Sequence, residues 1–321
     1  MFNEQKEQAA LNEINKLSNW GRWGKNDERG SLNLMSIESM RRGFSAAKKG
    51  KVYPLGQHVR ENQVPLVRGL PPNMHFMGLD GGDYAAGLKR AGGRGGSYDY
   101  IVIGSHGVAT HVDGLAHTWV DEKLYNGFHQ NTVRSYGATR LGIENVEGIV
   151  GKGVLLDFAA FKGVPHLPAD YYIDATELES CAKAEGVTIE KGDIVLIRTG
   201  WRKTYPQLME HWCDAQPGIG ITAALWLAKK EVVSVGSDNL AIQPVIGFPL
   251  DEYEHKPVKD DPRQEFANIH TALLNKLGMY LVELLDLEAL SQDKVHEFLF
   301  CLAPLMIKGG TGSPVNPLAV A

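Results

Sequence analysis

The sequence predicts a mixed α/β fold, because short apolar runs typical of buried strands alternate with longer segments of helical periodicity. The strand-like runs are residues 98–103, 154–158, 194–198, 232–235 and 279–285. The helical segments are residues 4–17, 175–185, 221–230 and 264–277. No internal repeat or clear linker divides the 321 residues, so we expect one domain over residues 1–321, with an N-terminal helical arm over about residues 1–35.

The N-terminal arm begins with an amphipathic helix over residues 4–17 and continues into a Trp-rich segment. The side of the helix expected to face the core carries Ala9, Ala10, Ile14 and Leu17. Trp20 and Trp23 follow. They are candidates for one wall of a pocket that binds a flat ring, and the alternative is that they anchor the N-terminal arm.

Residues 67–97 are rich in glycine and proline, including Pro71-Pro72 and the run at 92–96. This composition predicts a loop. The glycine-rich run lacks the flanking strand and helix of a dinucleotide-binding fingerprint, so we interpret the segment as a mobile loop over a functional site.

Residues 251–263 are rich in charge and proline, which predicts a surface excursion or an oligomer contact.

Near the C-terminus, His270 lies on the predicted helix 264–277, which Gly278 is placed to cap. Glu283 is the single acid within the apolar run 279–285. A carboxylate buried in an apolar strand needs a cation, because an unpaired buried charge is costly. That cation is either a metal ion or the side chain of an Arg or Lys.

Composition indicates a soluble enzyme-sized chain and excludes some partners. A hydrophobic content of 43% over 321 residues supports a substantial core. The net charge of −5, without a basic block, argues against nucleic acid. Residues 1–19 are polar, and no apolar run approaches the roughly 20 residues that cross a bilayer, so we expect a cytoplasmic protein that does not bind a membrane. The three cysteines, expected to be reduced structural thiols, are Cys181, Cys213 and Cys301.

The most informative motif is His111-x-Asp113-x-x-x-His117, which places three metal-competent or proton-transferring side chains within seven positions. On an extended segment His111 and Asp113 point to the same face, because side chains alternate with period two. His117 can then complete the ligand set or stand beside it as a base. Imidazole and carboxylate ligands together suit Zn²⁺ or Mn²⁺.

This motif resembles that of the metal-dependent cyclase family of hydrolases, which includes kynurenine formamidase and isatin hydrolase, and within it the longer branch typified by trans-dienelactone hydrolase. Further matching segments are 19–24, 30–33, 124–127, 192–201, 237–239 and 312–317. The resemblance implies a swivelling β/β/α fold with mixed sheets and flanking helices. It assigns His111, Asp113, His270 and Glu283 to the metal and His117 to proton transfer. It also implies a homodimer or homotetramer, often with the N-terminal segment exchanged between copies.

One position departs from the shorter members of the family, which have a further metal-binding histidine where this chain has Gly107. His106 lies one residue earlier, and on a regular strand a shift of one residue turns a side chain to the opposite face. A bulge or turn at Gly107 would restore the geometry. The sequence therefore leaves His106 open between a metal ligand and a loop residue.

The ligand set predicts hydrolysis, because a divalent ion activates water and polarises a carbonyl. We expect a small-molecule substrate, either a cyclic ester or amide such as a lactone, or an arylformamide. A serine hydrolase is disfavoured because the chain has no Gly-x-Ser-x-Gly elbow. The remaining alternative is a metal-dependent small-molecule binding protein without turnover, for which Gly107 in a ligand position is the argument.

Overall fold

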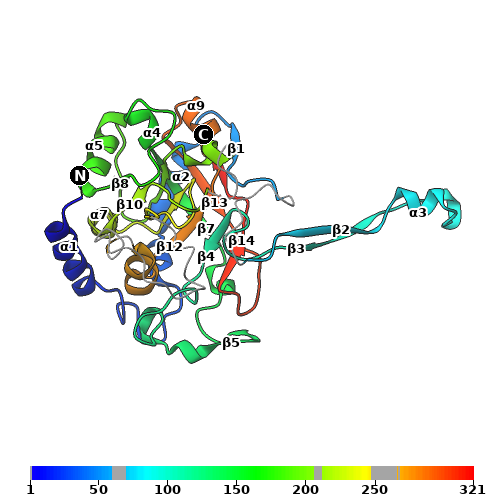
Figure 1. The fold of residues 1–321 in the computed structure, drawn as a ribbon, viewed down its shortest axis with the longest axis horizontal. Helices are drawn as coiled ribbons and strands as arrows, with labels where there is room; N and C mark the ends of the chain where they lie inside the picture. The colour runs from blue at the N-terminus through cyan, green and yellow to red at the C-terminus, as the bar shows by residue number, and fades with distance from the viewer. Residues whose placement is uncertain (1, 60–69, 206–211, 247–265, 267) are drawn as a thin grey trace.

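The computed structural model describes residues 2–59, 70–205, 212–246, 266 and 268–321. The body is built on a nine-stranded mixed sheet in the order β1-β15-β13-β7-β9-β11-β12-β4-β14 (Figure 1). These strands are β1 (Val52–Pro54), β4 (His111–Asp113), β7 (Ile149–Asp157), β9 (Ile194–Arg198), β11 (Ser234–Ser237), β12 (Tyr280–Glu283), β13 (Glu297–Leu302), β14 (Gly312–Pro314) and β15 (Leu318–Val320). The mixed α/β prediction is confirmed.

The centre of the sheet is parallel, with β7, β9, β11 and β12 adjacent in that order. Parallel strands are covered on both faces and therefore read as continuous apolar runs, as Ile194–Arg198 does. Antiparallel strands complete both edges. On the edge that matters for function, β4 pairs with β12 and β14 pairs with β4. The chain thus brings residues 111–113 beside residues 281–283.

The helices lie around this sheet, apart from α3, which lies at the tip of a projecting hairpin (Figure 1). They are α1 (Glu4–Lys16), α2 (Ile37–Ala46), α3 (Gly81–Ala85), α4 (Phe158–Phe161), α5 (Ala175–Glu185), α7 (Ile221–Lys229), α9 (Glu288–Gln292) and the π-helix η8 (Thr271–Leu277). Short 3₁₀ turns are η1 (Gly30–Leu34), η2 (Ala91–Gly93), η3 (Tyr125–Gly127), η4 (Gln130–Thr132), η5 (Ile143–Val146) and η6 (Trp201–Thr204). In Figure 1, α1, α5 and α7 lie along one side of the body.

The predicted N-terminal helix forms, but it buries a different set of side chains from the one expected. Ala10 and Ile14 are buried, whereas Ala9 and Leu17 are exposed and Glu7 is buried instead. The Glu7 carboxylate accepts hydrogen bonds from the hydroxyl of Tyr172 at 2.7 Å and the backbone N–H of Thr222 at 3.0 Å, which offset its desolvation. These bonds help to pack α1 against α7.

The later elements follow the sequence closely, with differences in extent and in helix type. The predicted helix 175–185 and strand 194–198 form as expected, and β7 is longer than the predicted 154–158. The predicted strand 232–235 begins two residues later, at Ser234. The segment before Gly278 is a π-helix rather than an α-helix and is buried on nearly all sides. Gly278 caps it with φ +63°, and residues 251–263 lie outside the described residues.

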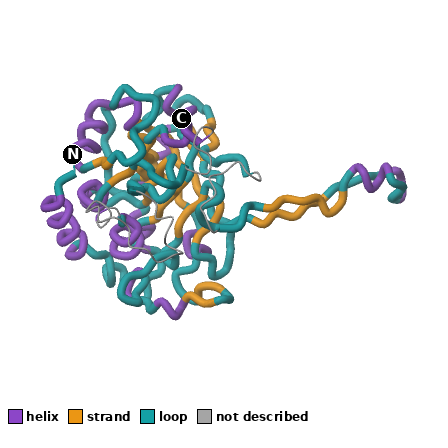
Figure 2. The backbone as a smooth tube through the Cα atoms, in the orientation of Figure 1, coloured by secondary structure: helices purple, strands orange, loops and turns teal. Residues whose placement is uncertain are grey.

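The expectation of a mobile loop at residues 67–97 over the site is wrong for the part that is described. β2 (Met74–Leu79) and β3 (Tyr98–Val102) form an antiparallel hairpin with α3 at its tip. Figures 1 and 2 show this hairpin projecting far from the body. We call residues 70–103 the arm. The Asn73 side chain fixes its base by donating a hydrogen bond to the Val108 carbonyl at 2.6 Å.

Smaller two-stranded sheets pair β8 (Tyr172–Ile173) with β10 (Gly218–Ile219) and β5 (Val133–Arg134) with β6 (Gly137–Ala138). The three cysteines are free thiols, two of them buried. Among the described residues, none of the helices combines the length and the apolar character needed to cross a bilayer.

Candidate metal centre

The β4–β12 pairing places two ligand-type side chains opposite each other, because its register sets Glu283 against His111. The Nε2 atom of His111 lies 3.4 Å from Oε2 of Glu283. Asp113 points to the same side of β4, two residues along, with its Oδ1 atom 3.5 Å from the same Nε2. An imidazole and two carboxylates thus meet near one edge of the sheet, on the two strands next to the edge strand β14.

His270 reaches this cluster from the N-terminal end of η8. Its Nε2 atom lies 3.2 Å from Oε1 of Glu283 and 3.5 Å from Oδ2 of Asp113. On the other side of the ring, Nδ1 lies 3.1 Å from Oε1 of Gln243. The structure therefore brings together all four residues that the family resemblance assigns to a metal.

His106 also lies in the cluster, although Gly107 occupies the position of the further histidine. Gly107 has φ +69°, a left-handed conformation that glycine adopts at little cost, and the chain turns there instead of continuing as a strand. Nδ1 of His106 lies 2.7 Å from Oδ1 of Asp113, and Nε2 lies 2.9 Å from the hydroxyl of Thr311. The regular-strand expectation that His106 faces away is wrong.

His117 completes the arrangement. Its ring stacks on that of His106, with centroids 3.9 Å apart and an interplanar angle of 14°. Within the described residues, two overlapping groups have ligand atoms close enough together to hold an ion: His106, His111 and Asp113, and Asp113, His117 and His270. Asp113 belongs to both groups.

Burial and charge set the protonation of the metal-free site. Burial by itself lowers the pKa of His111 and His270, but the neighbouring carboxylates Glu283 and Asp113 outweigh it and raise these pKa values to about 9 and about 10. Hydrogen bonds and charges from the histidines hold the pKa of Asp113 and Glu283 below the ordinary range, despite burial. For His117, burial dominates and lowers the pKa to about 4.

The donor set fits a divalent cation on two observations. First, Oδ2 of Asp113 and Oε1 of Glu283 are buried and accept no well-formed hydrogen bond, although His270 lies at ion-pair distance from both. Second, both histidines have a partner on the ring nitrogen that faces away from the cluster. Nδ1 of His111 lies 2.7 Å from the Ala109 carbonyl, and Nδ1 of His270 faces Oε1 of Gln243. Such outer partners fix the ring so that Nε2 is available as a ligand.

Trp20 and Trp23, the predicted pocket wall, make their described contacts outside this cluster. The indole N–H of Trp20 donates to the Asn275 carbonyl at 2.6 Å, and Lys276 lies over its ring. The Arg22 guanidinium lies over Trp23. These contacts tie the N-terminal segment to η8 and favour the anchoring alternative.

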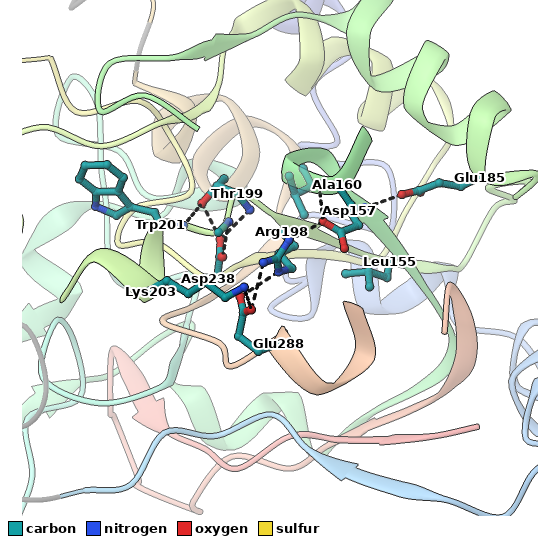
Figure 3. Close-up of polar contacts among 12 residues, drawn as sticks. Leu155, Asp157, Ala160, Glu185, Arg198, Thr199, Trp201, Lys203, Asp238 and Glu288 are labelled. Atoms are coloured by element: carbon teal, nitrogen blue, oxygen red, sulfur yellow. Dashed lines mark hydrogen bonds and ion pairs between the residues drawn. The ribbon is translucent and has the colours of Figure 1, made fainter. Parts of the chain in front are cut away.

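A buried polar network outside the cluster holds the neighbouring strand ends in place (Figure 3). Arg198 at the end of β9 contacts Asp157 at 2.7 Å and Glu288 at 2.8 Å. Asp238, just after β11, accepts hydrogen bonds from Thr199. The carbonyl of the next residue, Asn239, accepts a hydrogen bond from the N–H of Leu284, which follows Glu283. The network thus supports the backbone that carries Glu283.

The sequence did not identify Thr311, Gln243 and Thr110 as parts of the site; the hydroxyl of Thr110 donates a hydrogen bond to the carbonyl of Leu284, next to Glu283. Thr311 directly precedes the segment 312–317, and Thr110 directly precedes His111, so both lie beside segments that carried the resemblance. Gln243 had no such signal, because its role depends entirely on where the chain places it beside His270.

The fold and site together define a class: mixed α/β proteins with a histidine and carboxylate centre at the edge of one curled sheet. The family model described as putative cyclase matches residues 45–244, and the chain belongs to this cyclase family. A crystal structure described as a novel cyclase is 33% identical, with a TM-score of 0.84, over 96% of this chain and 99% of that one.

More distant structures share the fold. An isatin hydrolase bound to the product analogue thioisatinate is 20% identical, with a TM-score of 0.59, over 89% of this chain and 99% of that one. Isatin hydrolase A from Ralstonia solanacearum is 22% identical, with a TM-score of 0.53, over 84% and 91% of the two chains. None of the curated proteins compared with the sequence matches it.

Proposed function

We propose that the protein is a metal-dependent hydrolase that opens a cyclic ester or amide, such as a lactone, or cleaves an arylformamide. The observation that carries this proposal is the convergence of His111, Asp113, His270 and Glu283, with two buried carboxylate oxygens that lack a well-formed hydrogen bond. These four residues would hold one Zn²⁺ or Mn²⁺ ion, because imidazole and carboxylate ligands suit both metals.

When bound, a divalent ion at such a site activates water as a nucleophile and polarises a carbonyl. His117 is the proposed general base. In the metal-free site burial lowers its pKa, so the ring is neutral at pH 7 and has a free nitrogen that can accept a proton from the attacking water and return it to the leaving group. The stacked ring of His106 fixes its orientation.

The choice of substrate class rests on analogy with relatives. Two of the similar structures are described as isatin hydrolases, and one of them has the product analogue thioisatinate bound. Their identity of about 20% supports the shared fold, so the cyclic amide or ester is a proposal for this chain. The pocket wall formed by Trp20 and Trp23, the homodimer or homotetramer and the cytoplasmic location also stay predictions.

The test is acid release from a panel of lactones, cyclic amides and arylformamides, followed with a pH indicator. Metal-stripped protein should be inactive, and reloading with Zn²⁺ or Mn²⁺ should restore turnover. The variant His117→Ala separates catalysis from metal binding. It should retain the ion and lose roughly two to four decades in kcat, the usual contribution of a general acid or base.

The alternative is a metal-dependent binding protein without turnover. It would be favoured if the metal-loaded protein bound members of the panel in calorimetry and released no acid from any of them. Loss of the ion in His117→Ala would instead make His117 a ligand, in line with the group it forms with Asp113 and His270. Metal content per chain distinguishes one ion from two.

A further inference from the structure

Residues 241–243 form a strained turn beside the candidate metal centre. Ala241 and Ile242 are consecutive residues in the left-handed region, with φ +71° and +60°. The N–H of Gln243 donates to the Ala241 carbonyl, which closes a three-residue turn centred on Ile242. A positive φ at the centre of such a turn is rare and strained, and for a β-branched residue it is an outlier. Strain of this kind persists only where the surrounding structure imposes it.

The neighbouring segment 216–219 imposes this turn. The Ile242 carbonyl accepts a hydrogen bond from the N–H of Ile219 at 3.0 Å, and the Ile242 side chain is buried in the main core. Gly218 lies directly against the turn, since a Cβ at that position would lie 2.2 Å from the carbonyl carbon of Gln243. Hydrogen bonding, burial and close backbone contact therefore fix the backbone of Gln243.

The turn directs the side chain of Gln243 to the start of η8. Its Oε1 atom accepts a hydrogen bond from the backbone N–H of Ile269 at 3.0 Å and lies 3.1 Å from Nδ1 of His270. A backbone N–H can only donate, so the atom that faces it must be the amide oxygen and not the amide nitrogen. The same oxygen faces Nδ1 of His270, and an oxygen of this kind only accepts. Nδ1 therefore carries a hydrogen.

We propose that Gln243 is a positioning residue for His270, and that the strained turn at Ile242 places it. With the hydrogen held on Nδ1, a neutral ring keeps its lone pair on Nε2. Nε2 is the atom that lies 3.2 Å from Oε1 of Glu283 and 3.5 Å from Oδ2 of Asp113. Gln243 thus leaves Nε2 as the ring nitrogen that can bind a cation in the cluster. It would act through His270 without contacting the ion.

A neutral amide suits this position better than a charged partner. The cluster already contains two carboxylates, Asp113 and Glu283, whose charges balance that of one divalent ion. A third buried carboxylate would have to be paired as well, whereas an amide orients the ring without adding charge. The inference rests on the metal site of the proposed function and is independent of the substrate.

The first test is the Zn²⁺ affinity of the full-length protein, measured by competition with a chelator. Gln243→Leu removes the acceptor and should lower the affinity by about 10–100-fold, the usual effect of losing an outer partner. Gln243→Glu keeps an acceptor at the same place and should bind Zn²⁺ much as the wild type does. Gln8→Leu is the matched control, since Gln8 is exposed on α1, and it should leave the affinity unchanged.

The second test is nuclear magnetic resonance of isotope-labelled histidine, which does not require a metal. In the metal-free wild type the Nδ1–H signal of His270, assigned by its absence from His270→Gln, should be protected from exchange with water. It should disappear in Gln243→Leu and persist in Gln243→Glu. In Cd²⁺-loaded wild type, the cadmium nucleus should couple to Nε2 of His270 and not to Nδ1.

Gly218→Ala extends the test to the turn, because the added Cβ cannot fit against Gln243. It should lose the protected Nδ1–H signal while circular dichroism shows a folded body, and a retained signal would show that the turn does not place Gln243.

Two results overturn the role of Gln243 itself. One is an unchanged Nδ1–H signal in Gln243→Leu. The other is equal loss of signal and affinity in Gln243→Leu and Gln243→Glu, which would indicate a role in packing alone. A wild type that binds no metal would overturn the proposed hydrolase instead, and the Nδ1–H signal of the metal-free protein would still decide whether Gln243 orients His270.

Discussion

The hydroxyl of Thr110 donates a hydrogen bond of 2.6 Å to the carbonyl oxygen of Leu284. Thr110 directly precedes His111, and Leu284 directly follows Glu283, so this bond joins the two strands next to their ligand side chains. Leu284 has φ +56°, a left-handed conformation that costs a non-glycine residue about 1–3 kcal/mol. Gln57 donates a second bond to the same oxygen at 2.8 Å. Together these bonds hold a strained turn beside the candidate metal centre.

Replacing Thr110 with Val should therefore weaken metal binding, although the two side chains have the same shape. The variant removes this donor, so that the Leu284 carbonyl accepts from the Gln57 side chain without it, and it also removes the acceptor of the Gln57 backbone N–H. Loss of an outer partner of this kind typically costs 10–100-fold in metal affinity. The measurement is competition for Zn²⁺ with a chelator. Thr110→Ser keeps the hydroxyl and should bind like the wild type, and equal affinity in all three proteins would refute the coupling.

His270→Ala and Glu283→Ala should each lose the metal. Both lie more than 150 residues from Asp113 in the sequence, yet the structure places all three in one cluster. Either change also leaves a buried charge without its partner, which costs several kcal/mol of stability in the metal-free protein. Metal per chain, measured by plasma emission spectroscopy after identical dialysis, checks the result. Exposed His129, changed to Ala, is the control. Normal metal content in both site variants would contradict a shared ion.

His106→Ala should reduce metal affinity by about one to two decades, because Nδ1 of His106 lies 2.7 Å from a carboxylate oxygen of the candidate ligand Asp113. Gly107→Ala tests the turn that brings His106 there. A Cβ in the left-handed region costs roughly 1–2 kcal/mol and should displace His106. Chelator competition measures both variants. Metal binding unchanged in His106→Ala would show that His106 is only a loop residue.

The stability of the metal-free protein should depend on pH through the site. The pKa values of His111 and His270 are raised from 6.5 to about 9 and about 10, so their contribution is complete below pH 6.5 and is lost as the pH rises through 9 and 10. Asp113 and Glu283 have lowered pKa values, so their contribution is complete above their ordinary values of 3.8 and 4.5 and is lost as the pH falls. His117 acts in the opposite sense, because its lowered pKa makes stability fall as the pH drops below 6.5, so the site contributes most near pH 6.5.

Urea unfolding in the presence of a chelator, from pH 5 to pH 10, measures this dependence. The comparison is with His111→Gln, which keeps a polar side chain and cannot titrate in this range. The difference in unfolding free energy between wild type and variant should shrink as the pH rises. A constant difference would mean that His111 is not charged in the metal-free protein. Reloading with Zn²⁺ should restore wild-type stability at high pH, since a ligand that binds only the native state stabilises it.

The sequence by itself predicted the parts of the site that local periodicity controls. The period of two in a strand places His111 and Asp113 on one face, and a lone acid in the apolar run 279–285 requires a cation. Helix 175–185 was equally predictable, because Asp174 and Glu177 form a capping box and Gly186 ends the helix in the left-handed conformation. These features depend on residues within a few positions of each other.

Only the tertiary structure decided which distant segments meet. The register of β12 against β4 sets Glu283 opposite His111, and no local pattern encodes that pairing. The turn at Gly107 reverses the expected direction of His106 relative to His111, because a left-handed residue between them breaks the alternation of side chains along a strand. The second strand of the arm was predicted at residues 98–103, but the first strand and the tip were interpreted as a loop, because their glycines and prolines outweighed a weak alternation over six residues. Strand pairing, which stabilises both the arm and the metal centre, depends on contacts between segments far apart in sequence, and a single sequence specifies these only through the folded chain.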